Sequence, residues 1–182
     1  TTTTPFDIFA YDNSGTLALE TLNWTNDTTR ATAIAIAGDG RYYKSGDTSR
    51  LYLGTGRTTG TSGQTQDMSS SRFLYNWYNK VMRPINVTYE STHTYTTGSY
   101  RAWIANTTIG QARTEFIIGL PTMVDLIMSA AWEAIDTNDV GPRMALGLDS
   151  VSAASFGSLY IDGLTASGAD LYGYSIPYKW YP

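Results

Sequence analysis

Short apolar runs with a period of two, separated by clusters of turn residues, constrain the fold of this chain most. Residues 6–11 (FDIFAY) alternate in this way and end in residues 12–15 (DNSG), a cluster typical of a tight turn. Residues 33–37 (AIAIA) and 41–44 (RYYK) flank the glycine-rich residues 38–40 (GDG). Alternation over five or six residues predicts half-buried strands, and a glycine-rich turn between two such runs predicts a β-hairpin.

Further runs of the same kind extend along the chain. We interpret them as strands over residues 17–24, 50–53, 72–90, 94–97, 100–104, 114–118, 144–148 and 158–161. Residues 123–135 fit a helix, but residues 124–132 also fit a central strand, and the pattern alone leaves both open. Many short strands without alternating helices predict an all-β fold, an antiparallel β-sandwich of jelly-roll type with at most one short helix.

The length of 182 residues suits one domain. We expect an extended N-terminal arm over residues 1–5 and a single β-sandwich domain over residues 6–182. Residues 54–71 are rich in Gly, Thr, Ser and Gln and almost free of large apolar groups, so we predict a long surface loop there. Because the first residue is Thr1 and not Met, we expect a processed start or a piece of a longer chain.

Charge and composition argue against several classes of partner. The net charge is −4 and the pI is about 4.8, so the chain lacks the basic excess that drives binding to nucleic acid or to an anionic membrane. No apolar run approaches the roughly 18 residues of a membrane span. The chain has no Cys, which removes disulfides, thiolate catalysis and Cys-ligated metals. We therefore expect neither nucleic acid nor membrane as a partner.

The sequence contains few candidate catalytic residues, and no motif singles any of them out. The only histidine, His93, has Glu90 as its nearest carboxylate in sequence, and we interpret it as a surface or strand-end residue. Paired carboxylates could hydrolyse glycosides, but no spacing selects a pair among the four glutamates and the aspartates. The glutamates are Glu20, Glu90, Glu115 and Glu133. Most aspartates fall in turn clusters, where they cap backbone groups. We therefore predict no catalytic residue.

Two loops superficially resemble ligand-binding motifs. Residues 136–141 (DTNDVG) resemble the opening of a calcium loop, but Gly147 stands where an EF-hand needs an acidic ligand. Residues 54–60 resemble a glycine-rich phosphate loop, but no helix follows them. We predict no metal and no cofactor.

Several aromatic residues fall in predicted loops or edges. They could stack on sugar rings, or they could pack in the core or in a subunit interface, which aromatic side chains also favour. The residues are Tyr100, Trp103, Tyr172, Tyr174 and Trp180. The sequence leaves both interpretations open, so the ligand-binding residues stay unknown.

An ordered series of runs is similar to a family of β-rich structural proteins of tailed bacteriophages, of the head-fibre, capsid-decoration or tail-fibre kind. The runs are residues 24–33, 44–46, 50–55, 57–65, 67, 72–79 and 83–84, with weaker similarity at 117–119 and 147–150. The similarity covers about two thirds of the chain. The family continues past the segment that matches residues 179–182, so the resemblance leaves the C-terminal attachment open.

The resemblance implies a structural part of a virion and no catalyst. We expect a protein that decorates or cements the capsid surface, as a homotrimer bound to the major capsid protein or another virion protein. The alternative is a carbohydrate- or receptor-binding module of a tail fibre, with a surface glycan as ligand. A third possibility is a fragment of an enzyme such as a depolymerase. In the first interpretation, the arm at 1–5 and the loop at 54–71 contact neighbouring subunits.

Overall fold

The computed structural model describes backbone and side chains for residues 3–61, 63–87, 99, 101–102, 107–111 and 113–120. It also describes the backbone of strands at 123–132, 143–144, 159–160 and 170–179. The chain divides into two compact units, Thr1–Tyr89 with Thr108–Leu120, and Glu90–Thr107 with Pro121–Pro182. The single sandwich domain over residues 6–182 stays a prediction.

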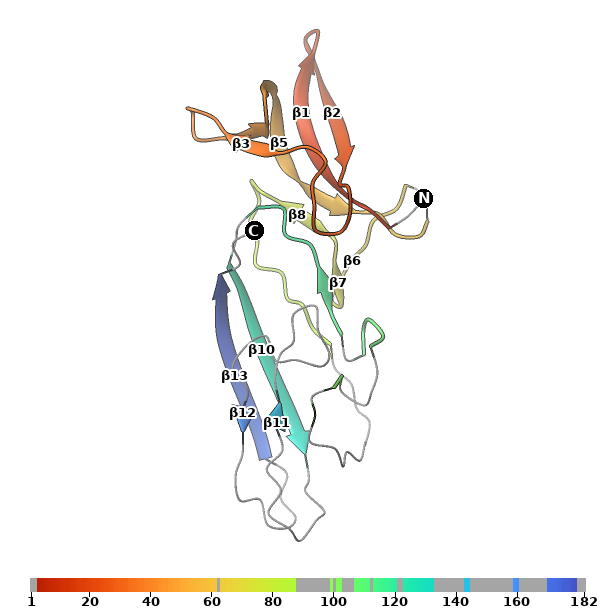
Figure 1. Ribbon diagram of the computed structural model, residues 1–182, viewed down its shortest axis with the longest axis vertical. Helices are drawn as coiled ribbons and strands as arrows, with labels where there is room; N and C mark the ends of the chain where they lie inside the picture. Colours follow the sequence, from red (N-terminus) through yellow and green to blue (C-terminus); the bar gives the residue numbers. More distant parts are fainter. Residues whose placement is uncertain are drawn as a thin grey trace. The chain divides into compact units, whose positions relative to one another are not determined.

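All regular elements among the described residues are strands, which confirms the predicted all-β class (Figure 1). The main sheet has six strands in the order β2-β1-β5-β4-β3, with β8 also paired to β5. These strands are β1 (Pro5–Asn13), β2 (Thr16–Asn23), β3 (Ile34–Ile36), β4 (Tyr42–Lys44), β5 (Asp47–Arg57) and β8 (Leu74–Asn76). Every pair in this sheet is antiparallel, as predicted, whereas the jelly-roll order of strands stays a prediction.

A small second sheet completes the first unit. It consists of β6 (Asp67–Met68), β7 (Ser71–Arg72) and β9 (Glu115–Phe116). β6 and β7 are antiparallel, whereas β7 and β9 run parallel, and the isolated Ile109–Arg113 bridge is parallel as well. β9 confirms the strand predicted over residues 114–118, although it is shorter.

The β1–β2 hairpin forms where the alternating pattern predicts it. Its two-residue turn places Ser14 at φ 55° and Gly15 at φ 85°, the combination of a type I′ turn. Asp12 Oδ1 accepts the N–H of Gly15 at 2.6 Å and so stabilises the turn. The second predicted hairpin is present as β3 and β4, with Gly40 at φ 78° in its turn. Figure 1 shows these two hairpins on opposite sides of β5.

The predicted N-terminal arm is too long. Pro5 is the first residue of β1 and is fully buried, and its carbonyl accepts the N–H of Trp24 at 2.8 Å. Two hydrogen bonds join Thr4 to Thr58. The Thr4 N–H donates to Thr58 Oγ1 at 3.1 Å, and the Thr58 N–H donates to the Thr4 carbonyl at 3.2 Å. A run of threonines carries no periodicity, so the sequence did not show that residues 4 and 5 continue the sheet.

The predicted loop over residues 54–71 is also too long. Residues 54–57 complete β5, residues 67–68 are β6, and Ser71 begins β7. Glycine occurs in β5 for packing, because a Cβ at Gly54 would collide with the carbonyl oxygen of Tyr75 and one at Gly56 would lie 2.7 Å from the Phe6 ring. Of the described residues in this range, 58–61 and 63–66 lie outside the strands, joined by the Thr58–Thr65 bridge, and residues 69–70 form the turn between β6 and β7.

The strand predicted over residues 72–90 breaks into short pieces. β8 ends at Asn76, whose Oδ1 accepts the N–H groups of Tyr78 at 3.0 Å and Asn79 at 3.1 Å. This turn competes with the strand ladder and ends it. Residues 77–87 contain no strand. The Arg72 guanidinium anchors this segment by donating two hydrogen bonds to the carbonyl of Pro84, at 2.9 and 3.1 Å.

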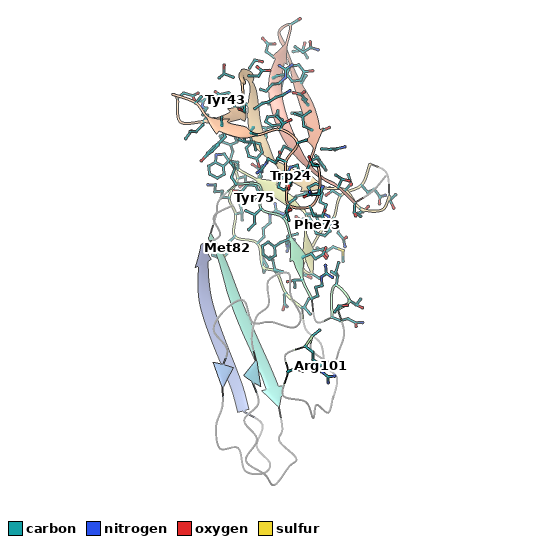
Figure 2. All side chains as sticks on the ribbon, in the orientation of Figure 1. Trp24, Tyr43, Phe73, Tyr75, Met82 and Arg101 are labelled. Atoms are coloured by element: carbon teal, nitrogen blue, oxygen red, sulfur yellow. The ribbon has the colours of Figure 1, made fainter. Side chains whose placement is uncertain are left out.

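The core of the first unit lies on one face of the main sheet, called the inner face here. Phe9, Tyr52 and Leu120 are its buried hydrophobic centre, and Phe9 and Tyr52 meet edge to face at 5.9 Å. Partly buried side chains surround the centre: Leu22, Ile34, Tyr42, Tyr75 and Trp77. Figure 2 shows Trp24 and Tyr75 among the side chains gathered near the base of the sheet.

The described part of the second unit consists of two strand pairs. β10 (Met123–Trp132) pairs with β13 (Asp170–Lys179) over ten residues, and β11 (Arg143–Met144) pairs with β12 (Leu159–Tyr160). β10 decides between the two interpretations of residues 123–135 in favour of a strand. The strands predicted over 94–97 and 100–104 lie almost wholly outside the described residues.

Candidate functional site

A chain of polar groups crosses the buried core of the first unit. Thr55 Oγ1 donates to Asp7 Oδ1 at 2.6 Å, and the hydroxyls of Tyr52 and Thr55 are 2.7 Å apart. Arg30 completes the chain, because its Nε donates to Asp7 Oδ2 at 2.8 Å. We call Asp7, Arg30, Tyr52, Thr55 and Gly119 the buried polar cluster. The polar groups of this cluster hydrogen-bond to one another within the fold, as buried polar groups require.

A bulge in the sheet makes this cluster possible. Side chains three residues apart on a regular strand point to opposite faces. The pairing of β1 with β5 shifts between Ile8 and Phe9, which leaves Leu53 as an extra residue in β5. Tyr52 and Thr55 therefore lie on the same face, beside Phe9 and Asp7.

Arg30 and Gly119 bring a distant segment onto the sheet. The Arg30 Nη2 group donates to the carbonyl of Gly119, and the guanidinium lies 4.4 Å from the centre of the Trp24 ring. A Cβ at Gly119 would collide with the hydroxyls of Tyr52 and Thr55. The backbone at 119 thus sits directly on the cluster and places Leu120 in the core.

The surroundings of Tyr52 keep its phenol neutral. Burial raises the pKa of Tyr52 well above its ordinary value of 10.0, with the nearby Asp7 carboxylate adding to the rise. Its hydroxyl therefore serves as a hydrogen-bonding group at every physiological pH. The cluster is closely packed, and its role is to hold residues 119–120 against β1 and β5.

A second charged group lies on the inner face, farther along the sheet. Glu20 accepts from Lys44 at 3.2 Å and from Arg50 at 2.9 Å, and all three side chains are about a quarter exposed. The Arg50 guanidinium also lies 3.8 Å from the centre of the Tyr11 ring. Two cations therefore share the single carboxylate, and one of them, Arg50, also lies over an aromatic ring.

The opposite face of the main sheet, called the outer face here, carries exposed apolar side chains next to polar ones such as Thr21 and Asn76. Residues paired across neighbouring strands share a face, and the registers place one set of apolar residues together: Ile8, Ala10, Leu17, Leu19, Leu51 and Leu74. Leu17 is 78% exposed, Leu19 62% and Leu74 40%. Exposed leucines on one face of a sheet are a candidate interaction surface in a soluble protein.

The predicted carboxylate candidates separate into two groups. Glu20 and Glu115 lie in ion pairs, the latter with Arg57 at 2.9 Å and with Arg113. Glu90, Glu133 and His93 lie outside the residues whose side chains are described. No two of the described glutamates come together as a pair.

The prediction that aspartates cap turns is confirmed where the structure describes them. Asp39 Oδ1 accepts the N–H of Arg41 at 3.0 Å, and Asp47 Oδ1 accepts that of Ser49 at 3.0 Å. The bond from Arg41 N–H, followed by one from the Tyr43 hydroxyl at 2.8 Å, lowers the pKa of Asp39 below 3.8. Asp136 and Asp139 of the calcium-like loop lie outside the described residues.

The five aromatic candidates for sugar stacking lie outside the residues with described side chains. Among the described residues, two tryptophans carry cations on their rings: Arg30 lies over Trp24, and Lys80 Nζ lies 3.2 Å from the centre of Trp77. Trp77 also meets Tyr42 edge to face at 4.9 Å. Both rings are engaged within the fold, which fits the packing interpretation for these two residues.

The described ranges hold no group of three His, Cys, Asp or Glu side chains that could bind a metal ion. The part of the chain that the structure describes also contains no helix with the length and hydrophobicity of a membrane span. Comparison of the chain with protein-family models, with curated proteins and with solved structures found no match.

Sequence reasoning missed the outer face as a candidate interaction surface. The pattern that could have found it is the apolar content of both sets of alternating positions. Residues 6–11 place Phe6, Ile8 and Ala10 on one face and Phe9 and Tyr11 on the other. A strand with one face in water alternates apolar with polar groups, so a strand apolar on both faces indicates a sheet that is covered twice.

Proposed function

We propose that this chain is a non-enzymatic structural protein of a phage virion, which decorates or cements the capsid surface as a homotrimer. The observation that carries the proposal is the exposed outer face, around Leu17, Leu19 and Leu74. The runs between residues 24 and 84 that resemble phage structural proteins lead to the same expectation. A structural protein binds its neighbours through an exposed surface and does not require a ligand pocket.

The packing of the first unit supports a role in assembly. The inner face of the main sheet has its own cover in Leu120, Tyr75 and Trp77, and it contains the buried polar cluster. On the outer face, Leu17, Leu19 and Leu74 remain exposed. Covering exposed leucines contributes about 25 cal/mol per Å² of apolar surface removed from water, so attachment to a capsid gains free energy at this face.

The first experiment counts the copies of this protein on purified particles by quantitative mass spectrometry, with the major capsid protein as internal standard. A decoration or cement protein is present in hundreds of copies. Tens of copies or fewer would favour the tail-fibre module, and absence from the particle would overturn the virion proposal.

The second experiment tests the outer face directly. Particles that lack the protein are mixed with purified wild type, with Leu74→Lys or with Met68→Lys. Both residues are exposed apolar side chains, but Leu74 lies on the outer face and Met68 lies in the small second sheet. We expect Leu74→Lys to lower occupancy and Met68→Lys to leave it unchanged. Equal occupancy of both variants would contradict the role of the outer face.

The predicted contact elements need revision in this context. Deleting residues 54–71 would remove the end of β5, with the buried Thr55 of the polar cluster, so loss of binding would reflect unfolding. A deletion of residues 60–63 stays within the loop that the Thr58–Thr65 bridge closes. It tests the loop as a contact element without cutting the sheet.

A further inference from the structure

The outer edge of β2 has a defined set of unpaired backbone groups. β2 is a terminal strand of the main sheet, and no described strand pairs with its outer edge. The type I′ turn makes Asn13 and Thr16 a hydrogen-bonded pair, and such pairs then alternate along the hairpin. The bond from Trp24 N to Pro5 O continues this alternation. The even-numbered residues of β2 therefore bond to β1.

It follows that the odd-numbered residues of β2 direct their N–H and C=O groups away from the sheet. They are Leu17, Leu19, Thr21 and Asn23. Proteins usually guard such an edge with proline, a bulge or a free charge, because it is a template for another strand. β2 has no proline, and its register with β1 is unbroken. Its one charged residue, Glu20, is paired with Lys44 and Arg50 on the inner face.

We propose that β2 pairs with β2 of a second copy of this chain, antiparallel, about a two-fold axis at Leu19. Outward-directed residues must pair with outward-directed residues, which limits the centre to a few positions. An axis at Glu20 would place two carboxylates directly opposite each other, which is unfavourable. An axis at Ala18 would leave both Thr21 and Asn23 beyond the pairing of the two strands, and an axis at Thr21 would place the apolar Leu19 opposite the polar Asn23.

The axis at Leu19 avoids these arrangements and leaves only Asn23 beyond the pairing. It pairs Leu19 with Leu19 of the second copy and Leu17 with Thr21, so three hydrogen-bonded pairs form. It also places Glu20 opposite Ala18, so the two carboxylates are not directly opposite each other. The leucine side chains lie on the outer face, and the pairing continues that apolar face from one copy into the next.

The area of the contact sets its strength. Seven residues of antiparallel strand extend over about 24 Å, and one strand of this length buries less than the roughly 800 Å² per partner of a stable interface. The contact is therefore weak in dilute solution and becomes populated at the local concentration of a crowded surface. It goes beyond the proposed virion role, because a two-fold contact joins copies in pairs and is separate from the predicted homotrimer.

Single cysteines test the pairing, because the chain contains no Cys of its own. In the proposed register the two Leu19 Cα atoms lie about 5.5 Å apart, within disulfide reach. In Leu17→Cys, the thiol of one copy lies about four residues out of register with the thiol of the other, which separates them by roughly 13 Å. Ile36→Cys is the second control, since Ile36 lies on the other terminal strand and is 62% exposed, as is Leu19.

We expect Leu19→Cys to form a disulfide-linked dimer at least about tenfold faster than either control under mild oxidation. Equal rates at the three positions, or a faster rate at Leu17→Cys, would overturn the proposal. Sedimentation of cysteine-free protein between about 10 μM and 1 mM provides the second readout. Self-association should weaken in Leu19→Lys and persist in Ile36→Lys, and its absence from wild type over that range would also overturn the proposal. Neither measurement uses particles, so the β2 pairing and the proposed virion role can each be contradicted independently of the other.

Discussion

The carboxylate of Asp7 and the guanidinium of Arg30 form an ion pair of 2.8 Å, although 23 residues separate them in the chain. The side chain of Asp7 is 3% exposed and that of Arg30 is 20% exposed. Removing one partner of a buried pair leaves the other charge without compensation, and this costs more than the pair itself contributes. The fold of the first unit therefore depends on both residues.

We expect Arg30→Met to lower the free energy of unfolding by about 3 kcal/mol, because it leaves the Asp7 carboxylate buried and partly unpaired. It also removes the bond to the carbonyl of Gly119. The matched control is Arg41→Met, which breaks a 3.9 Å pair with Asp39 between exposed side chains. That substitution should cost less than about 1 kcal/mol. Urea unfolding followed by tryptophan fluorescence measures both.

The double variant Asp7→Asn/Arg30→Met distinguishes the uncompensated charge from lost packing. An amide at position 7 still accepts the hydrogen bond from Thr55 but needs no counter-ion. We expect the double variant to be more stable than Arg30→Met alone. A double variant that is less stable than the single one would show that the charge of Asp7 is not the source of the loss.

Gly119→Ala should destabilise the first unit by about 1–3 kcal/mol, since overpacking forces a rigid neighbourhood to move. A Cβ there would collide with the hydroxyls of Tyr52 and Thr55 and would lie 2.7 Å from Tyr75 Cδ1. Gly38→Ala is the control, because a Cβ at Gly38 has no atom within 4 Å. Equal melting temperatures for the two variants would contradict the close packing at Gly119.

The local parts of the fold could be predicted from sequence because their determinants are local. Alternation and turn residues predicted β1, β2 and the β3–β4 hairpin, and Asp12, Asp39 and Asp47 cap turns as expected. β13 was missed, although Tyr172, Tyr174, Ile176 and Tyr178 alternate there, because Gly173 and Pro177 are residues that usually interrupt strands.

The buried polar cluster could not be predicted, because its geometry depends on distant contacts. Thr55 reaches Tyr52 only through the bulge at Leu53, and a period-two reading places the two side chains on opposite faces. Gly119 comes to the cluster from 64 positions beyond Thr55, and its lack of a side chain matters only after Tyr52 is in place. Composition near residues 54–57 indicated a loop, whereas the glycines there permit close packing in β5.

Ser14→Asn should stabilise the β1–β2 hairpin. Ser14 has a φ of 55°, a left-handed conformation in which serine is strained and asparagine is tolerated. Asn-Gly is also the preferred sequence of a type I′ turn. We expect a gain of up to about 1 kcal/mol in the free energy of unfolding. Gly15→Ala, at φ 85°, should lose a similar amount, and a melting temperature that falls in Ser14→Asn would contradict the assigned turn.

The pair formed by Asp39 and Tyr43 makes a prediction for pH. The bond from the Arg41 N–H, followed by the 2.8 Å bond from the Tyr43 hydroxyl, lowers the pKa of Asp39 from 3.8, and the bond to Asp39 raises the pKa of Tyr43 from 10.0. Stabilisation from Asp39 is therefore present above pH 3.8 and is lost as the pH falls through its lowered pKa, whereas that from Tyr43 is present below pH 10.0 and is lost as the pH rises through its raised pKa. Carbon NMR titration of the Asp39 carboxyl and the Tyr43 ring measures both shifts. In Asp39→Asn the pKa of Tyr43 should return toward 10.0, and an unchanged Tyr43 titration would show that another group causes the rise.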